Sequence, residues 1–170
     1  MKKEIESKSD VIKLISPFLE DLRKIWRKHK SDYKINKNIK KMIHTFICVS
    51  FEKVPVDYIS KQTIEKLPTD LQTPPYNFPW NIKRTKNKEP FKEFLCEHCN
   101  PLNEIIDNIC NTNEQVSNIL EKQLKTAWIA KKENELLDKN YRKRRPGGWK
   151  KCYKECDIKL LDKNGKEIKH

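Results

Sequence analysis

The sequence predicts a mostly α-helical protein with a small C-terminal β-hairpin, in which the last part is an α+β unit clipped by zinc. Apolar residues recur at helical spacing in the N-terminal half and again after residue 100. Two cysteine pairs and one Asn-Gly dipeptide lie in the C-terminal half. These patterns predict three parts: a helical basic unit over 1–67, a proline- and aromatic-rich connector over 68–92, and a cysteine-bearing unit over 93–170.

The N-terminal part is expected to form three helices. The first covers residues 11–26, with Ser9 or Asp10 as its cap, and Pro17 is expected to start or kink a helix there. A second apolar stretch predicts a helix that ends near Ser50. A third, short helix is expected after Pro55.

The connector is defined by five prolines between residues 67 and 90. They alternate with Tyr76, Phe78 and Trp80. Because proline lacks an N–H and disfavours helix in the residue before it, we expect an extended segment that packs its aromatic side chains on the core.

The C-terminal part predicts one long helix and one hairpin. Asn100-Pro101 is a suitable helix entry, and Thr112 with Gln115 has capping-box spacing. An apolar stripe then continues through Leu137, which predicts roughly 25 residues of amphipathic helix ending near Asn140. Asn164-Gly165 predicts a β-hairpin turn.

The net charge of +13 is concentrated in two segments. Residues 23–41 hold nine basic residues and one acid, and residues 141–154 hold seven basic residues and no acid. Their sum is +15, so the remainder of the chain carries −2. Charge grouped in this way is typical of polyanion binding. The candidate nucleic-acid contacts are Arg23, Arg27, Lys28, Lys40, Lys41, Arg142, Lys143, Arg144, Arg145, Trp149, Lys150 and Lys151.

The second basic segment has three other interpretations. Arg-Lys-Arg-Arg-Pro has the composition of a nuclear import signal. The cations would also complement the dipole of a solvated helix end, or contact an acidic protein.

The cysteine pairs predict one structural Zn²⁺ ion. Two thiolates from each short pair can reach one tetrahedral ion, and the expected ligands are Cys96, Cys99, Cys152 and Cys156. The 52-residue gap between the pairs exceeds that of compact zinc modules, so a helical insertion would have to bridge it. Cys110 or His98 is the substitute ligand, and buried free thiols are the alternative.

Together these patterns favour a zinc-stabilised nucleic-acid-binding accessory protein of a larger nucleoprotein assembly, with RNA or DNA as partner. The alternative is a protein-interaction adaptor or inhibitor that binds an acidic partner through its long helix and basic loop. A zinc-supported nuclease comes third.

Other classes are disfavoured by composition. With three glycines in the whole chain, no glycine-rich phosphate loop is present. No apolar run approaches the ~18 residues of a membrane span, and no signal peptide is visible. We therefore expect an intracellular protein without a membrane partner, cytoplasmic or nuclear, that is more readily a binding protein than an enzyme.

Overall fold

The computed structural model describes residues 7–52, 54–76, 78 and 91–169. The chain divides into two compact units, each built from two segments. The first unit comprises Met1–Val54 and Leu102–Leu124, and the second comprises Pro55–Pro101 and Lys125–His170. The boundaries expected at residues 67 and 92 do not coincide with this division. Composition along the chain cannot show that residues 102–124 pack with N-terminal helices rather than with their sequence neighbours.

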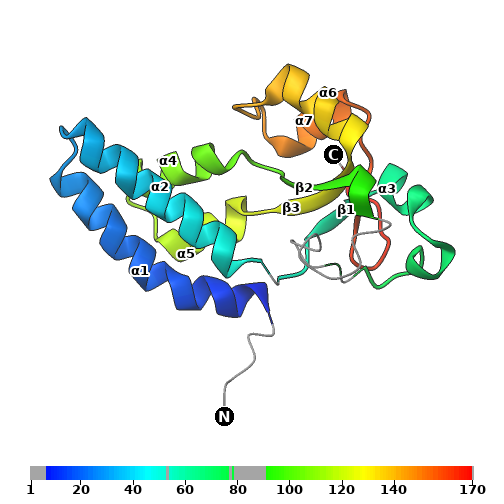
Figure 1. Cartoon of the computed structure of the whole chain (residues 1–170), viewed down its shortest axis with the longest axis horizontal. Coiled ribbons are helices and arrows are strands. Elements are labelled where there is room, and N and C mark those ends of the chain that lie inside the picture. The colour runs from blue at the N-terminus through cyan, green and yellow to red at the C-terminus, as the bar shows by residue number, and fades with distance from the viewer. Residues whose placement is uncertain (1–6, 53, 77, 79–90, 170) are drawn as a thin grey trace, which may run out of the picture. The chain divides into compact units, whose positions relative to one another are not determined.

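The first unit is helical (Figure 1). It contains α1 (Lys8–Lys28), α2 (Tyr33–Ser50), α4 (Leu102–Asn111) and α5 (Val116–Gln123). Its buried apolar residues recur on each helix: Val11, Ile12, Ile15, Leu19, Leu22 and Trp26, then Ile39, Ile43 and Ile47, then Ile105, Ile106 and Ile109, and finally Val116, Ile119 and Leu120.

Side-chain caps define where the two long helices begin. Ser7 accepts a hydrogen bond from the Asp10 backbone N–H, so α1 begins earlier than the sequence predicted. Asp32 caps α2 in the same way, through Ile35 N–H at 2.9 Å. The end of α2 at Ser50 is confirmed. The expectation that a helix starts at Pro17 is wrong, because α1 continues through it, while the alternative of a kink at Pro17 stays a prediction. Pro17 lies on the exposed face, where water can solvate the carbonyl group that loses its partner.

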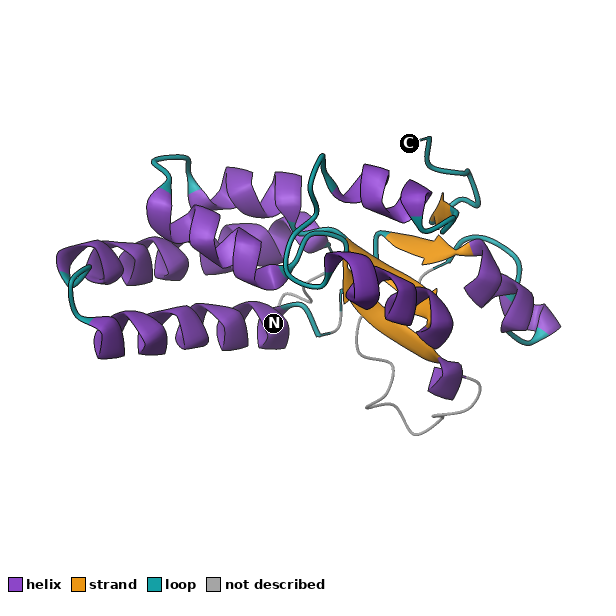
Figure 2. Ribbon diagram, turned by 90° about the horizontal axis from the view of Figure 1, so that it is seen from above, coloured by secondary structure: helices purple, strands orange, loops and turns teal. Residues whose placement is uncertain are grey.

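The second unit is built on a four-stranded mixed sheet (Figure 2). Its strands are β1 (Tyr58–Ser60), β2 (Phe94–His98), β3 (Thr126–Ala130) and β4 (Leu160–Asp162), in the order β2-β3-β1-β4. β1 pairs parallel with β3 and antiparallel with β4, and β2 pairs antiparallel with β3. The first unit's helices α4 and α5 are thus an insertion between two adjacent strands.

Three helices accompany the sheet: α3 (Lys61–Lys66), α6 (Lys131–Tyr141) and α7 (Trp149–Glu155). Short 3₁₀ turns cover Thr69–Leu71 and Phe91–Glu93. Side chains alternate between the faces of a strand, so two apolar clusters form. The first contains Val56, Ile59, Ile64, Leu67, Tyr76, Phe94, Trp128 and Ala130, and the second Cys99, Ala127, Ile129, Leu137, Tyr153, Ile158 and Leu160.

The prediction of one long helix after residue 100 is wrong. The segment forms α4, α5, β3 and α6 in turn, and only its end at Tyr141 is close to the expected Asn140. All five residues of β3 are buried. Leu124 and Trp128 have helical spacing by coincidence, since a central strand carries apolar side chains on both faces and has no polar stripe to mark its period.

The C-terminal turn at Asn164-Gly165 forms as predicted, but the segment after it makes one isolated β-bridge and not a second strand. Gly165 has φ +82°, and Asp162 N–H donates to the Lys166 carbonyl oxygen at 2.9 Å. β4 pairs with β1, while the returning segment bridges back to it only at Leu161 and Glu167. The protein is therefore mostly α with some β, as the sequence predicted at that level.

Part of the predicted connector lies outside the described residues, including Trp80 and the other residues of 79–90. Where it is described, its aromatic side chains pack as expected. Tyr76 is buried, and the Phe78 ring stacks near it with centroids 6.4 Å apart. No described helix is long and apolar enough to cross a membrane.

Candidate nucleic-acid interface

Arg145 anchors the second basic segment inside the second unit. Its side chain is 1% exposed and donates to Glu97 Oε1 at 3.0 Å and to the Tyr141 carbonyl oxygen. Arg145 was a predicted nucleic-acid contact, and it is instead a buried internal one. Burial raises the pKa of Glu97 to about 7, while the Arg145 guanidinium acts in the opposite direction.

Arg142, Lys143 and Arg144 lie between the end of α6 and this anchor, and all three are exposed. None of them has a side-chain hydrogen bond or ion pair with the described part of the chain. One arginine therefore holds the segment to β2, and three neighbouring cations remain available to an external anion.

The glycines after the anchor shape the entry into α7. Gly147 and Gly148 have φ +76° and +89°, a region that side chains rarely tolerate. A Cβ at Gly147 would lie 2.7 Å from Lys151 Cδ. The Gly-Gly pair thus lets α7 start directly beside the basic run.

α7 uses its aromatic residues for packing. The half-buried Trp149 ring lies 5.2 Å from Tyr58 and 5.8 Å from Tyr153, centroid to centroid. Lys150 Nζ lies 5.9 Å from the Trp149 ring centroid. Lys151 forms an exposed i,i+4 pair with Glu155. Trp149 is therefore largely a core residue, and Lys150 and Lys151 extend the exposed charge.

Two arginines of the first basic segment, the buried Arg23 and the exposed Arg27, donate hydrogen bonds within the first unit. Arg23 is buried, donates to the Glu114 carbonyl oxygen at 2.6 Å and pairs with Glu20. Arg27 donates to the carbonyl oxygen of Thr112. Thr112 and Glu114 lie in the turn between α4 and α5, so these arginines satisfy carbonyl groups that the helix end leaves open.

The lysines of this segment are more accessible. Lys40 Nζ is 2.6 Å from Asp107 Oδ1 at a largely exposed position. Lys28 and Lys41 are exposed, and neither pairs with a described residue. Of the five contacts predicted here, Lys28 and Lys41 are free to bind an anion, and Lys40 could exchange its partner.

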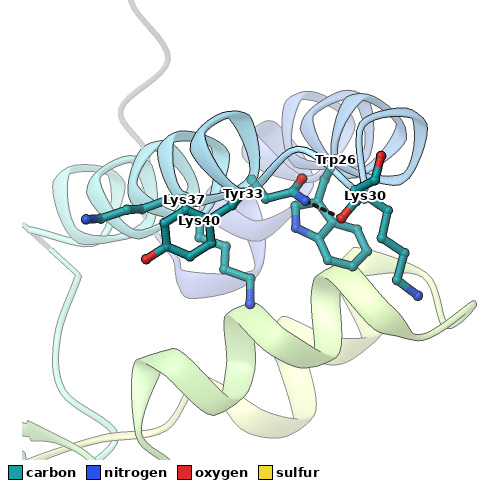
Figure 3. A pocket seen from close by; sticks show the side chains of 7 residues that line it. Trp26, Lys30, Tyr33, Lys37 and Lys40 are labelled. Carbon is teal, nitrogen blue, oxygen red and sulfur yellow. Dashed lines mark hydrogen bonds between the residues drawn. The ribbon is translucent and has the colours of Figure 1, made fainter.

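A pocket of about 400 Å³ opens where α1 meets α2, within the first unit (Figure 3). It is lined by Trp26, Lys30, Ser31, Tyr33, Asn36, Lys37 and Lys40. Figure 3 shows the Trp26 ring between the side chains of Lys30 and Lys40. This pocket was not predicted from the sequence, where Trp26 and Tyr33 among the lysines of residues 26–40 were the available signal.

The first pair of predicted zinc ligands is divided between the two apolar clusters of the second unit. Cys96 lies within β2, opposite Trp128, and packs against the first apolar cluster. Cys99 follows the strand and is buried in the second cluster. Residues three apart on an extended chain point to opposite faces, so this pair does not form the tight turn of a zinc knuckle.

Of the second cysteine pair, Cys152 lies in α7 and Cys156 is the C-cap that follows it. Cys152 is buried with its Sγ donating to the Pro146 carbonyl oxygen at 3.7 Å, and burial raises the pKa of both Cys152 and Cys156. Within the described residues, no group of three or more His, Cys, Asp or Glu side chains is placed to hold a metal ion. The predicted zinc site thus finds no support in this arrangement.

The substitute ligands do not change this picture. Cys110 is buried on α4 in the first unit, and burial raises its pKa to about 11. His98 is the last residue of β2 and pairs with Thr126 in the strand ladder. Cys110 therefore belongs to the core of the first unit, and His98 belongs to the sheet of the second.

Comparison with known proteins adds no assignment: no family model, no curated protein and no solved structure matches this chain.

Proposed function

We propose that this protein binds nucleic acid through phosphate contacts from exposed cations, chiefly Arg142, Lys143 and Arg144. The observation that carries the proposal is that one of four consecutive basic residues is buried and paired, while the other three are exposed and unpaired among the described residues. Arg145 is used internally, at 3.0 Å from Glu97, and its three neighbours have no internal use among the described residues. Arginine presents a planar fork of donors that suits phosphate.

Lys150 and Lys151 on α7 extend this surface, because α6 and α7 pack together. In the first unit, Lys28 and Lys41 supply further cations. An accessory role in a nucleoprotein assembly follows from this chemistry, since phosphate contacts give affinity without sequence preference.

The test is the salt dependence of binding to a mixed-sequence oligonucleotide. Wild-type protein is compared with Arg142→Ala/Lys143→Ala/Arg144→Ala, and fluorescence anisotropy is recorded from low to moderate salt. We expect the slope of log affinity against log salt to fall by roughly 2 to 3 in the variant, since each phosphate contact contributes about 0.9.

The matched control removes the same charge elsewhere in the same unit, with Lys159→Ala/Lys163→Ala/Lys166→Ala. These three lysines are also exposed. An equal fall in both triple variants would mean that net charge, and not this run, determines binding. No binding by the wild type at low salt would overturn the proposal.

A second candidate function, protein interaction, is favoured by an apolar groove on the first unit. The groove is lined by Phe18, Asn38, Lys41, Met42, Thr45, Phe46 and Val49. Val49 is 61% exposed and Met42 50%, and Leu14 adds another exposed apolar side chain on α1. Exposed apolar patches of this kind mark interaction sites.

The occupant that fits this groove is an amphipathic helix with acidic flanks. Lys41 lines the groove, and the positive charge of the chain opposes a second copy of itself. An acidic amphipathic peptide should bind the wild type and bind Phe18→Ser/Met42→Ser more weakly, and a basic peptide of the same apolar pattern should not bind. Equal binding of both peptides would rule out this function.

The zinc ion predicted from the sequence is not part of either proposal. Elemental analysis of the purified protein tests it directly. About one zinc per chain, lost in Cys96→Ser, would require the thiols of Cys96 and Cys99 to leave opposite faces of the sheet.

A further inference from the structure

We infer that the pocket between the end of α1 and the start of α2 binds one unstacked nucleobase of a single-stranded nucleic acid. This inference rests on the proposed function and adds to it a site where a base, and not only the phosphate backbone, is held. The lining combines aromatic, amide and lysine side chains, and its volume of about 400 Å³ is within the usual range of small-molecule sites.

The pocket lining holds one hydrogen-bond donor and one acceptor that have no partner among the described residues. Trp26 is 6% exposed, and its Nε1–H has no hydrogen-bond partner among the described residues. Asn36 Oδ1 is likewise buried without a partner, while its Nδ2 donates to the Lys30 carbonyl oxygen at 2.7 Å. That bond, drawn dashed in Figure 3, fixes the amide with its oxygen free to accept.

A nucleobase edge has the matching pattern. Each base presents an acceptor next to a donor on its Watson–Crick edge, such as the carbonyl oxygen and N–H of thymine. The acceptor would take the Trp26 Nε1 proton, and the N–H would bind Asn36 Oδ1. A phosphodiester has acceptors only and would leave the Asn36 oxygen unpaired, so phosphate alone does not fit this pair of atoms.

The surface around the pocket carries an exposed aromatic ring and exposed lysines. The Tyr33 ring is 78% exposed at the mouth, and a flat, exposed aromatic ring is a stacking platform for a base. Lys30 and Lys37 are exposed beside it and suit the flanking phosphates. Because these long side chains can rotate, a base can reach the covered Trp26 and Asn36 atoms.

The experiment compares two oligomers of equal length and charge, oligothymidylate and an abasic oligomer with the same phosphates. We expect wild-type protein to bind oligothymidylate about fivefold or more tighter, on the scale of one stacked base. Trp26→Phe keeps a ring but removes the donor, and should reduce this ratio about fivefold. Tyr33→Ser removes an exposed ring without touching the core and should also reduce it.

Ile25→Ala is the matched control, because Ile25 is exposed on α1 beside Trp26 but does not line this pocket. Equal affinity of the wild type for the two oligomers would overturn the inference and leave the proposed function intact. A ratio unchanged in both Trp26→Phe and Tyr33→Ser would also overturn it. Failure to bind either oligomer would overturn the proposed function and the inference with it.

Discussion

The two basic segments have similar charge in the sequence but different uses in the structure. Residues 23–41 lie in the first unit, and both of their arginines donate hydrogen bonds to carbonyl groups in the turn between α4 and α5. Residues 141–154 lie in the second unit, where Arg145 is the one basic residue of the segment that is buried. In the first segment the lysines remain accessible, and in the second both arginines and lysines do.

The difference teaches that a charge run is not uniform in function. An arginine can be buried if its donors are satisfied, because its delocalised charge is weakly hydrated. Arg23 and Arg145 are buried in this way, each against a carboxylate and a backbone carbonyl group. Counting positive charges therefore overestimates the binding surface wherever arginine has an internal partner.

The largest expected effect is the difference in unfolding free energy between substitutions at Arg145 and at its neighbour Arg144. Arg145→Met should lower the free energy of unfolding by about 3–5 kcal/mol, because it leaves the half-buried Glu97 without its partner. Arg144→Met, at an exposed position, should change it by less than about 0.5 kcal/mol. Urea denaturation measures both. Similar values for the two variants would contradict the anchoring role of Arg145.

The pH dependence of stability tests the same anchor. The pKa of Glu97 is about 7 in the folded state, above its ordinary 4.5, so folding favours the protonated form. This contribution to stability is fully present below pH 4.5 and is lost as the pH rises through about 7. It amounts to at most about 3.5 kcal/mol, at about 1.4 kcal/mol per pKa unit.

Glu97→Gln removes this titration. Between pH 5 and pH 8, the unfolding free energy of the wild type should therefore fall relative to that of the variant. Thermal or urea unfolding at the two pH values measures the difference. Parallel pH profiles of the two proteins would show that Glu97 keeps an ordinary pKa beside Arg145.

A smaller effect is expected for the internal arginine of the first segment. Arg23→Met should destabilise the protein by about 1.5–3 kcal/mol, since it removes charged hydrogen bonds to the α4–α5 turn. The salt slope of oligonucleotide binding should stay unchanged. Lys24→Met, its exposed neighbour, should leave stability within about 0.5 kcal/mol. A reduced salt slope in Arg23→Met would mean that this side chain contacts phosphate after all.

The smallest expected effect is on the salt slope of oligonucleotide binding, when cations of the two basic segments are removed separately. Lys28→Ala/Lys41→Ala should reduce the salt slope by less than about 2, because two contacts at most are lost. The triple variant at 142–144 should reduce it more. If the lysine pair has the larger effect, the first unit carries the main interface and the comparison above is reversed.

The sequence by itself determined the helices whose apolar residues face one side. The apolar spacing predicted α1 and α2, although not their caps at Ser7 and Asp32, and Asn164-Gly165 predicted the C-terminal turn, because these signals act between residues close in the chain. It also located both basic segments, since charge is a property of composition. It predicted Arg142, Lys143, Arg144 and Arg145 together as contacts, and could not separate the buried Arg145 from its exposed neighbours.

Only the tertiary structure decided how distant segments combine. β3 is a strand because β1 and β2 pair with it on both sides. A strand buried on both faces lacks the alternation of apolar and polar residues that would predict it from the sequence. The pairing of Arg145 with Glu97 joins residues 48 positions apart. The sheet also places Cys96 and Cys99 in different apolar clusters. Burial, and with it the choice between a core and a binding residue, depends on contacts that residue spacing does not encode.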